Sequence, residues 1–165
     1  MVNLMEVAGA RPVALITSRA EVEQMGRKML KDNVFTCSWN MPLSFNPALY
    51  GISVGKQRFS YKLIKSSRVF VVNFTPPTLK KAAVYCGTQS GEFIDKFKEA
   101  KLAVEEAEKI ECFRLKDAVA FLECEVVNEI EAGDHVLFVG RVVNLKINAD
   151  KKRLYHITGD KFEVI

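Results

Sequence analysis

The sequence predicts a mainly β protein, built as an antiparallel barrel with a few short helices. Short runs of β-branched and aromatic residues recur along the chain, each bounded by Gly, Pro, Asn or Asp. Helical spacing is confined to short segments, and no two strands are joined by the long amphipathic helix that parallel βαβ units require. The chain has 165 residues, 48% of them hydrophobic, which predicts a single domain over residues 1–165 with one substantial core.

Seven segments have the composition of strands. They are residues 13–17, 33–38, 50–54, 69–74, 118–130, 135–147 and 154–157. In the fifth, Leu122, Cys124 and Val126 alternate with Glu123, Glu125 and Val127, as in a half-buried antiparallel strand. The turn EAGDH then predicts a hairpin with the sixth, in which Gly140 marks a bulge or a sharp bend.

The helical signals lie in the middle of the chain. Residues 60–66 predict a helix with Ser60 as its N-cap, and the segment from Thr78 to Gly87 predicts a second. Residues 90–98 predict one more irregular helical piece.

Charge and composition narrow the class of protein. The formal net charge of +4 is weak for a dedicated nucleic-acid binder but suits a small anionic ligand. The amino terminus lacks a basic region before its apolar part, and no apolar run approaches the roughly 18 residues of a membrane span. We therefore expect a soluble, cytoplasmic protein that binds neither nucleic acid nor membranes.

The four cysteines form no CxxC pair, so no metal site is expected. Free thiols buried as small hydrophobes in a reducing compartment are the simplest interpretation. The alternatives are a disulfide between Cys112 and Cys124 or a redox-active Cys86.

The stretch GISVGKQRFS, residues 51–60, has the local chemistry of an anion site. It matches neither glycine-rich nucleotide-binding fingerprint. Even so, Ser53 supplies a hydroxyl, Lys56 and Arg58 supply charged donors, and Ser60 opens a predicted helix with free N–H groups. The alternative is that the two cations are solvated residues of an ordinary turn.

Trp39 and Asn40 lie where a predicted strand gives way to proline-containing turns. An indole and free amides at such a place suit a planar, polar-edged heterocycle. The alternative is that Trp39 is an ordinary core residue.

Three segments together resemble the flavin reductase-like, FMN-binding split-barrel family, including flavoredoxin-type proteins. They are TCSWNMPLSFNPALYGISVGKQRFSYKLIKSSRVFVVNF, SGEFIDKF and FLECEVVNEIEAGDHVLFVGRVV. The resemblance implies a six-stranded antiparallel Greek-key barrel that dimerises and holds FMN near the dimer interface.

The resemblance also implies site residues. Near the flavin ring it places Thr36, Cys37, Ser38, Trp39 and Asn40; near the ribityl chain or phosphate it places Ser53, Val54, Lys56, Phe59 and Ser60. Lys96 would reach the flavin or a partner's site, and His135 would lie near the flavin and the nicotinamide, although alone these residues suggest a surface lysine and a structural histidine. Arg58 is left unassigned.

The implied activity is that of an FMN-dependent oxidoreductase, which takes electrons from NAD(P)H or a protein donor. Non-catalytic alternatives are a flavin-binding or electron-carrier module and, from the aromatic and basic content, a barrel that binds single-stranded nucleic acid. Residues 18–33 depart from the compact turn of many relatives, and their sequence predicts a longer, more helical segment.

Overall fold

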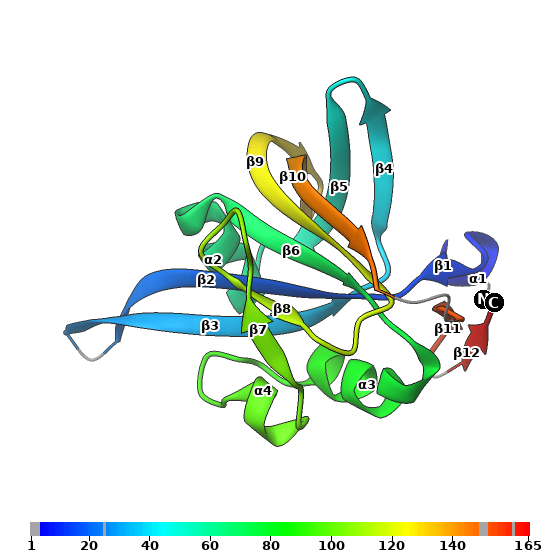
Figure 1. The fold of residues 1–165 in the computed structure, drawn as a ribbon, viewed down its shortest axis with the longest axis horizontal. Coiled ribbons are helices and arrows are strands. Elements are labelled where there is room, and N and C mark those ends of the chain that lie inside the picture. The colour runs from blue at the N-terminus through cyan, green and yellow to red at the C-terminus, as the bar shows by residue number, and fades with distance from the viewer. Residues whose placement is uncertain (1–3, 25, 149–151, 160) are drawn as a thin grey trace.

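A curled antiparallel sheet of seven strands forms the body of the computed structural model, which describes residues 4–24, 26–148, 152–159 and 161–165 (Figure 1). The strand order is β3-β2-β6-β9-β10-β5-β4. These strands are β2 (Ala14–Gln24), β3 (Arg27–Cys37), β4 (Asn40–Phe45), β5 (Ala48–Gly55), β6 (Val69–Phe74), β9 (Ala120–Ala132) and β10 (His135–Ile147).

Smaller elements surround this sheet. Two small sheets comprise β1 (Arg11–Pro12), β11 (Leu154–Thr158) and β12 (Lys161–Val164), and β7 (Val104–Glu106) with β8 (Phe113–Leu115). The helices are α1 (Leu4–Val7), α2 (Phe59–Ser67), α3 (Lys80–Thr88), which follows a 3-10 turn at Pro77–Leu79, and α4 (Lys96–Glu99). The prediction of a mainly antiparallel β protein with a few short helices is confirmed.

The core fills the curled sheet and continues beneath α3. Inside the curl, Ile16, Ile52, Phe70 and Phe138 are fully buried, as the alternation of each strand requires. Gly140 belongs to this packing, because a Cβ there would lie 2.6 Å from Cζ of Phe70. The predicted bulge at this glycine is present, since the register of β9 and β10 shifts between residues 139 and 140.

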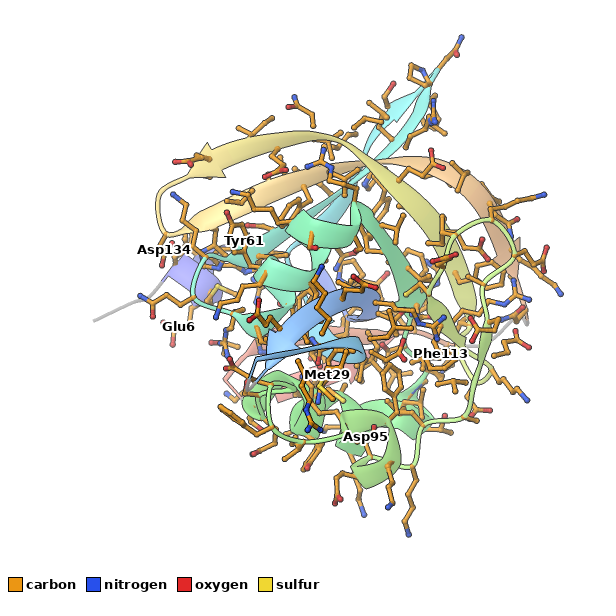
Figure 2. The ribbon with its side chains drawn as sticks, turned by 90° about the vertical axis from the view of Figure 1, so that its left-hand side faces the viewer. Glu6, Met29, Tyr61, Asp95, Phe113 and Asp134 are labelled. Atoms are coloured by element: carbon orange, nitrogen blue, oxygen red, sulfur yellow. The ribbon has the colours of Figure 1, made fainter. Side chains whose placement is uncertain are left out.

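The predicted helical character of residues 18–33 is wrong. They form most of the β2–β3 hairpin, a long arm that projects from the body; Figure 2 views the molecule from the side of this arm and labels Met29 on it. Opposite charges face each other across the arm, with Glu23 opposite Lys28 and an ion pair of 2.7 Å between Arg19 Nε and Asp32 Oδ1. These cross-strand pairs stabilise a hairpin that the sequence of one strand alone does not reveal.

A second difference concerns β4, which forms where the sequence predicted irregular backbone with two proline turns. It pairs with β5 and adds a seventh strand to the six that were expected. Just before β4, the carbonyl of Trp39 accepts a hydrogen bond of 2.9 Å from the amide of Ser53, which ties the end of β3 to β5. The curl is therefore closed at the place where the predicted ring-side and phosphate-side segments meet.

The four cysteines are all free and buried, as expected of thiols packed as small hydrophobes, and the alternative disulfide between Cys112 and Cys124 is absent. None of the helices within the described ranges is long and apolar enough to cross a membrane.

Candidate functional site

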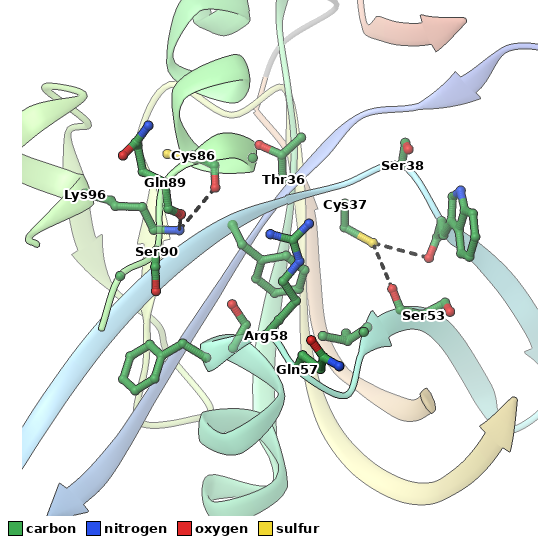
Figure 3. A pocket seen from close by; sticks show the side chains of 18 of the residues that line it. Thr36, Cys37, Ser38, Ser53, Gln57, Arg58, Cys86, Gln89, Ser90 and Lys96 are labelled. Atoms are coloured by element: carbon green, nitrogen blue, oxygen red, sulfur yellow. Dashed lines mark hydrogen bonds between the residues drawn. The ribbon is translucent and has the colours of Figure 1, made fainter. Parts of the chain in front are cut away.

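A cavity of about 280 Å³ lies where the end of β3, the β5–α2 turn and the α3–α4 connection meet. Figure 3 shows Arg58 between Lys96, Gln89 and Ser90 on one side and Cys37 and Ser53 on the other. The lining residues are Phe35, Thr36, Cys37, Ser38, Trp39, Ser53, Val54, Gly55, Gln57, Arg58, Phe59, Ser60, Cys86, Gly87, Gln89, Ser90, Gly91, Lys96 and His135.

The lining contains two cations, Arg58 and Lys96, and no aspartate or glutamate. The side chain of Arg58 makes no hydrogen bond or ion pair with any residue in the described part of the chain. Arg58 is also the N-cap of α2, and no side chain caps that helix. The first N–H groups of α2 therefore remain open beside two positive charges, an arrangement that favours an anion.

Lys96 is buried, with 3% of its surface exposed, although its sequence context suggested a surface lysine. Its Nζ donates hydrogen bonds to the carbonyl of Cys86 at 3.1 Å and to that of Gln89 at 3.2 Å, at the carboxyl end of α3. The pKa of Lys96 is lowered from 10.5 to about 8, mainly by burial; Cys86 opposes this shift and the charge of Arg58 adds to it. With two of its three donors engaged, Lys96 keeps one for the cavity.

Ser60 lies in the first turn of α2 and is 4% exposed. The sequence predicted Ser60 as the N-cap of this helix, and this prediction is wrong. The N-cap is Arg58, the extended residue before the first turn. The Ser60 hydroxyl accepts a hydrogen bond of 2.8 Å from Nδ2 of Asn33 on β3.

The rest of the lining is neutral, from Thr36 beside α3 to Cys37 at the end opposite Lys96, and its hydrogen bonds shape the chain. The Thr36 hydroxyl donates to the carbonyl of Ala83 and so fastens α3 to β3. The Cys37 thiol donates to the carbonyls of Trp39, at 3.3 Å, and Ser53, at 3.8 Å. Burial raises the pKa of Cys37 to about 12, which keeps this sulfur a thiol at neutral pH.

An aromatic pair closes this neutral end. The rings of Trp39 and His135 lie 4.8 Å apart between centroids and are inclined by 32°. Trp39 is 36% exposed, so it is a rim residue and not a member of the core. His135 shares a hydrogen bond of 2.7 Å through Nδ1 with Asp134, so that Nε2 is its remaining ring nitrogen.

The structure brings ten of the twelve sequence-predicted site residues to this cavity. They are Thr36, Cys37, Ser38, Trp39, Ser53, Val54, Phe59, Ser60, Lys96 and His135. Asn40 lies outside the lining, because its amide donates to the carbonyls of Pro12 and Cys37 and accepts from the Tyr50 hydroxyl. Lys56 also lies outside, and its Nζ pairs with Glu131 Oε2 at 3.0 Å.

The cavity also includes residues that the resemblance did not assign. Of the two cations that the local chemistry offered for an anion site, Arg58 lines the cavity and Lys56 does not. Gln57, Gln89, Ser90 and Gly91 also line it, the last three from the α3–α4 connection. No motif distinguishes these residues, although Arg58 lies two positions from the start of the predicted helix. No cluster of three or more metal-ligating side chains occurs among the residues with described positions.

Comparison with known proteins identifies similar chains. The family model described as "Flavin reductase like domain" matches residues 8–164. An uncharacterized protein of Archaeoglobus fulgidus is 37% identical over 145 residues, which cover 88% of this chain and 77% of that protein. Across five curated relatives, the matched regions cover from 19% to 77% of the relative's length.

Two solved structures carry the fold comparison. An FMN-binding protein from Thermus thermophilus, with bound p-hydroxybenzaldehyde, has a TM-score of 0.80 and 26% identity, covering 94% of this chain and 86% of that one. The flavin reductase PheA2 has a TM-score of 0.74 and 29% identity, covering 94% and 90%. The predicted split-barrel fold is therefore confirmed.

Proposed function

Because the chain belongs to the flavin reductase like domain family, we propose that it is an oxidoreductase that binds FMN in the cavity beside α2. The observation that carries this proposal is the unequal chemistry of the cavity. Arg58, Lys96 and an uncapped helix terminus give one part of the cavity positive charge without a lining carboxylate, and the part beyond Arg58 has neutral groups and the Trp39–His135 pair. A ligand with a phosphate at one end and a flat heterocycle at the other fits both.

In this proposal each end of the cavity binds a different part of FMN. Arg58, Ser60 and the first amides of α2 hold the phosphate, and the third donor of Lys96 faces the same ligand. The segment from Thr36 to Trp39 lies along the ring, and Ser53 lies beside Cys37 at that end. Asn40 acts indirectly, because its hydrogen bond to the Cys37 carbonyl supports the turn.

The flavin supplies the electron-transfer chemistry, since it accepts a hydride and releases electrons singly. The residues of this chain position the ring, supply positive charge and limit the access of water. No acid or base is needed for hydride transfer itself. His135 is proposed to contact the nicotinamide or the ring edge, because it stacks on Trp39 at the cavity rim.

Two similar structures support the choice of activity. One is described as an FMN-binding protein and the other as a flavin reductase, both above 25% identity over nearly the whole chain. We propose NAD(P)H or a reduced protein as the electron donor. The free, buried cysteines support a reducing compartment, which we propose is the cytoplasm.

A homodimer is also proposed. The β4–β5 hairpin exposes Met41, Leu43 and Phe45, and the side chain of Phe45 is 99% exposed. Exposed apolar side chains gathered on one hairpin favour burial against another protein surface. Sedimentation of the purified chain tests this part of the proposal, and a monomer at micromolar concentration would contradict it.

The central experiment is an anaerobic titration of the purified protein. We expect NADH or NADPH to bleach the visible absorbance of the bound flavin. After denaturation, the released flavin should have the mass of FMN. Protein that neither carries flavin nor quenches the fluorescence of added micromolar FMN would contradict the proposal. Retention of FAD in place of FMN would correct the cofactor.

The same preparation separates the modes of action. Rapid NADH-dependent turnover of added FMN would indicate a flavin reductase, whereas FMN retained through gel filtration would indicate a flavoredoxin-type protein. Bound FMN that no nicotinamide or protein donor reduces would indicate a flavin-binding module without turnover.

A further inference from the structure

Asn33 joins three segments at the cationic end of the cavity. It lies on β3 with 2% of its surface exposed, and its Nδ2 donates to Ser60 Oγ at 2.8 Å. Its Oδ1 is buried without a hydrogen-bond partner among the described residues. The bond to Ser60 is therefore the one side-chain hydrogen bond that fixes the orientation of this amide among the described residues.

Gly91 creates the space that this amide occupies. A Cβ at residue 91 would lie 1.9 Å from Oδ1 of Asn33 and 3.2 Å from Cε of Lys96. No ordinary side chain at position 91 can coexist with both neighbours in their present positions. The α3–α4 connection therefore approaches Asn33 and Lys96 closely only because residue 91 is a glycine.

The hydrogen bond from Asn33 determines what Ser60 can offer to the cavity. A serine hydroxyl has one donor proton and two acceptor lone pairs. Asn33 donates into one lone pair, and no other hydrogen bond to this hydroxyl occurs among the described residues. The Ser60 proton is therefore available to an acceptor in the cavity that Ser60 lines.

The opposite orientation of the amide would have the opposite effect. If the carbonyl oxygen of Asn33 faced Ser60, it would accept the Ser60 proton and turn a lone pair towards the cavity. An anion there would then meet an acceptor in place of a donor. The orientation of one buried amide thus determines whether Ser60 attracts or repels a phosphate.

We propose that Asn33 is a positioning residue for the flavin phosphate, which orients the Ser60 hydroxyl so that its proton points at the anion. This inference rests on the proposed function. It assigns to Asn33 no contact with the ligand, and it assigns to Gly91 the role of leaving room for the amide.

The test compares two ligands that differ by the phosphate. The full-length protein, freed of flavin, is titrated with FMN and with riboflavin by fluorescence quenching, for the wild type, Asn33→Ala, Ser60→Ala and the double variant. Losing a hydrogen bond to a charged group should weaken FMN binding about tenfold in Ser60→Ala. We expect a loss of about threefold to tenfold in Asn33→Ala, with riboflavin binding changed less than about twofold.

The double variant distinguishes positioning from a structural role. If Asn33 acts through Ser60, the double variant should bind FMN no more than about twofold more weakly than Ser60→Ala alone. Losses that multiply, or equal losses for FMN and riboflavin, would overturn the inference. If Asn33→Ala does not fold, Asn33→Leu replaces it in the same cycle, because leucine keeps about the same volume and has no group that can donate to Ser60.

The wild type separates this inference from the proposed function. A wild type that binds neither flavin overturns both. A wild type that prefers FMN to riboflavin, together with an Asn33→Ala variant that keeps the full preference, overturns the role of Asn33 alone.

Discussion

At one end of the cavity the chemistry comes from charged side chains, and at the other from neutral groups held by their own hydrogen bonds. Lys96 lies at the first end, and Arg58 lies between the two ends at the open terminus of α2. At the second, the thiol of Cys37 donates to the carbonyls of Trp39 and Ser53. The first end can bind a charged group of a ligand, whereas the second has the shape to contact the face of a flat ring.

This difference predicts which ligand features each end detects. Charge recognition depends on individual side chains, so single substitutions there should separate FMN from riboflavin. Recognition of a flat ring depends on the shape of the turn around Trp39, which both flavins would contact alike. The ratio of the two dissociation constants therefore distinguishes the two ends.

The largest expected effect is that of Arg58→Ala. Arg58 is exposed to the cavity without a partner among the described residues, and it can form bidentate bonds to a phosphate. Its loss should weaken FMN binding by roughly tenfold to a hundredfold, with riboflavin binding changed less than about twofold. Fluorescence titration measures both constants.

Lys56→Ala is the matched control. Lys56 has the same charge and lies two residues away, but its ammonium group is paired with Glu131 outside the cavity. We expect it to change FMN affinity less than about twofold. A loss equal to that of Arg58→Ala would restore Lys56 as the phosphate ligand that the sequence suggested.

These two cations show what the sequence could and could not determine. Clusters of β-branched and aromatic residues located β6 and β10 at their observed bounds, because strand composition and turn residues are local signals. The direction of a side chain is not local. Lys56, just after β5, pairs with Glu131 on β9, two strands away in the sheet, and Lys96 reaches two carbonyls at the end of α3.

Asn33 illustrates the same limit for the site. Its sequence neighbours mark it only as a residue near the start of a strand, and its hydrogen bond to Ser60 joins residues 27 positions apart.

The β2–β3 arm was missed for a related reason. Charged residues such as Glu23 and Lys28 have no β preference of their own, and they are stabilised by their partners across the hairpin.

A second, smaller effect is expected at the neutral end. Trp39→Ala removes the partner of His135 and the indole surface of the rim. Aromatic contacts contribute about 0.5–1.5 kcal/mol beyond their buried area, so FMN and riboflavin should both bind about threefold to tenfold more weakly. The ratio of the two constants should not change, and Trp39→Phe should restore part of the affinity for both. A loss confined to FMN would place the phosphate, and not the ring, beside Trp39.

The smallest expected effect is a dependence of the FMN preference on pH through Lys96. In the flavin-free protein its ammonium group, with a pKa of about 8, is charged below that pH and loses its proton above it. A bound phosphate would stabilise the charged form, so affinity for FMN should fall severalfold as the pH rises from about 7 to 9, while affinity for riboflavin changes little. Lys96→Met should bind FMN more weakly at pH 7 and remove this dependence.

The folding stability of the flavin-free wild type should change with pH in the opposite sense. Because Lys96 keeps its proton up to about pH 10.5 in the unfolded chain but only to about pH 8 in the folded one, the free energy of unfolding should rise between about pH 8 and 10.5. Urea unfolding of the wild type and of Lys96→Met measures this difference. The thiol of Cys86, whose pKa burial raises to about 11, titrates above the range used for the binding measurement. If the FMN affinity of Lys96→Met depends on pH as that of the wild type does, another group causes the effect. Arg58 would then be the cation that binds the phosphate.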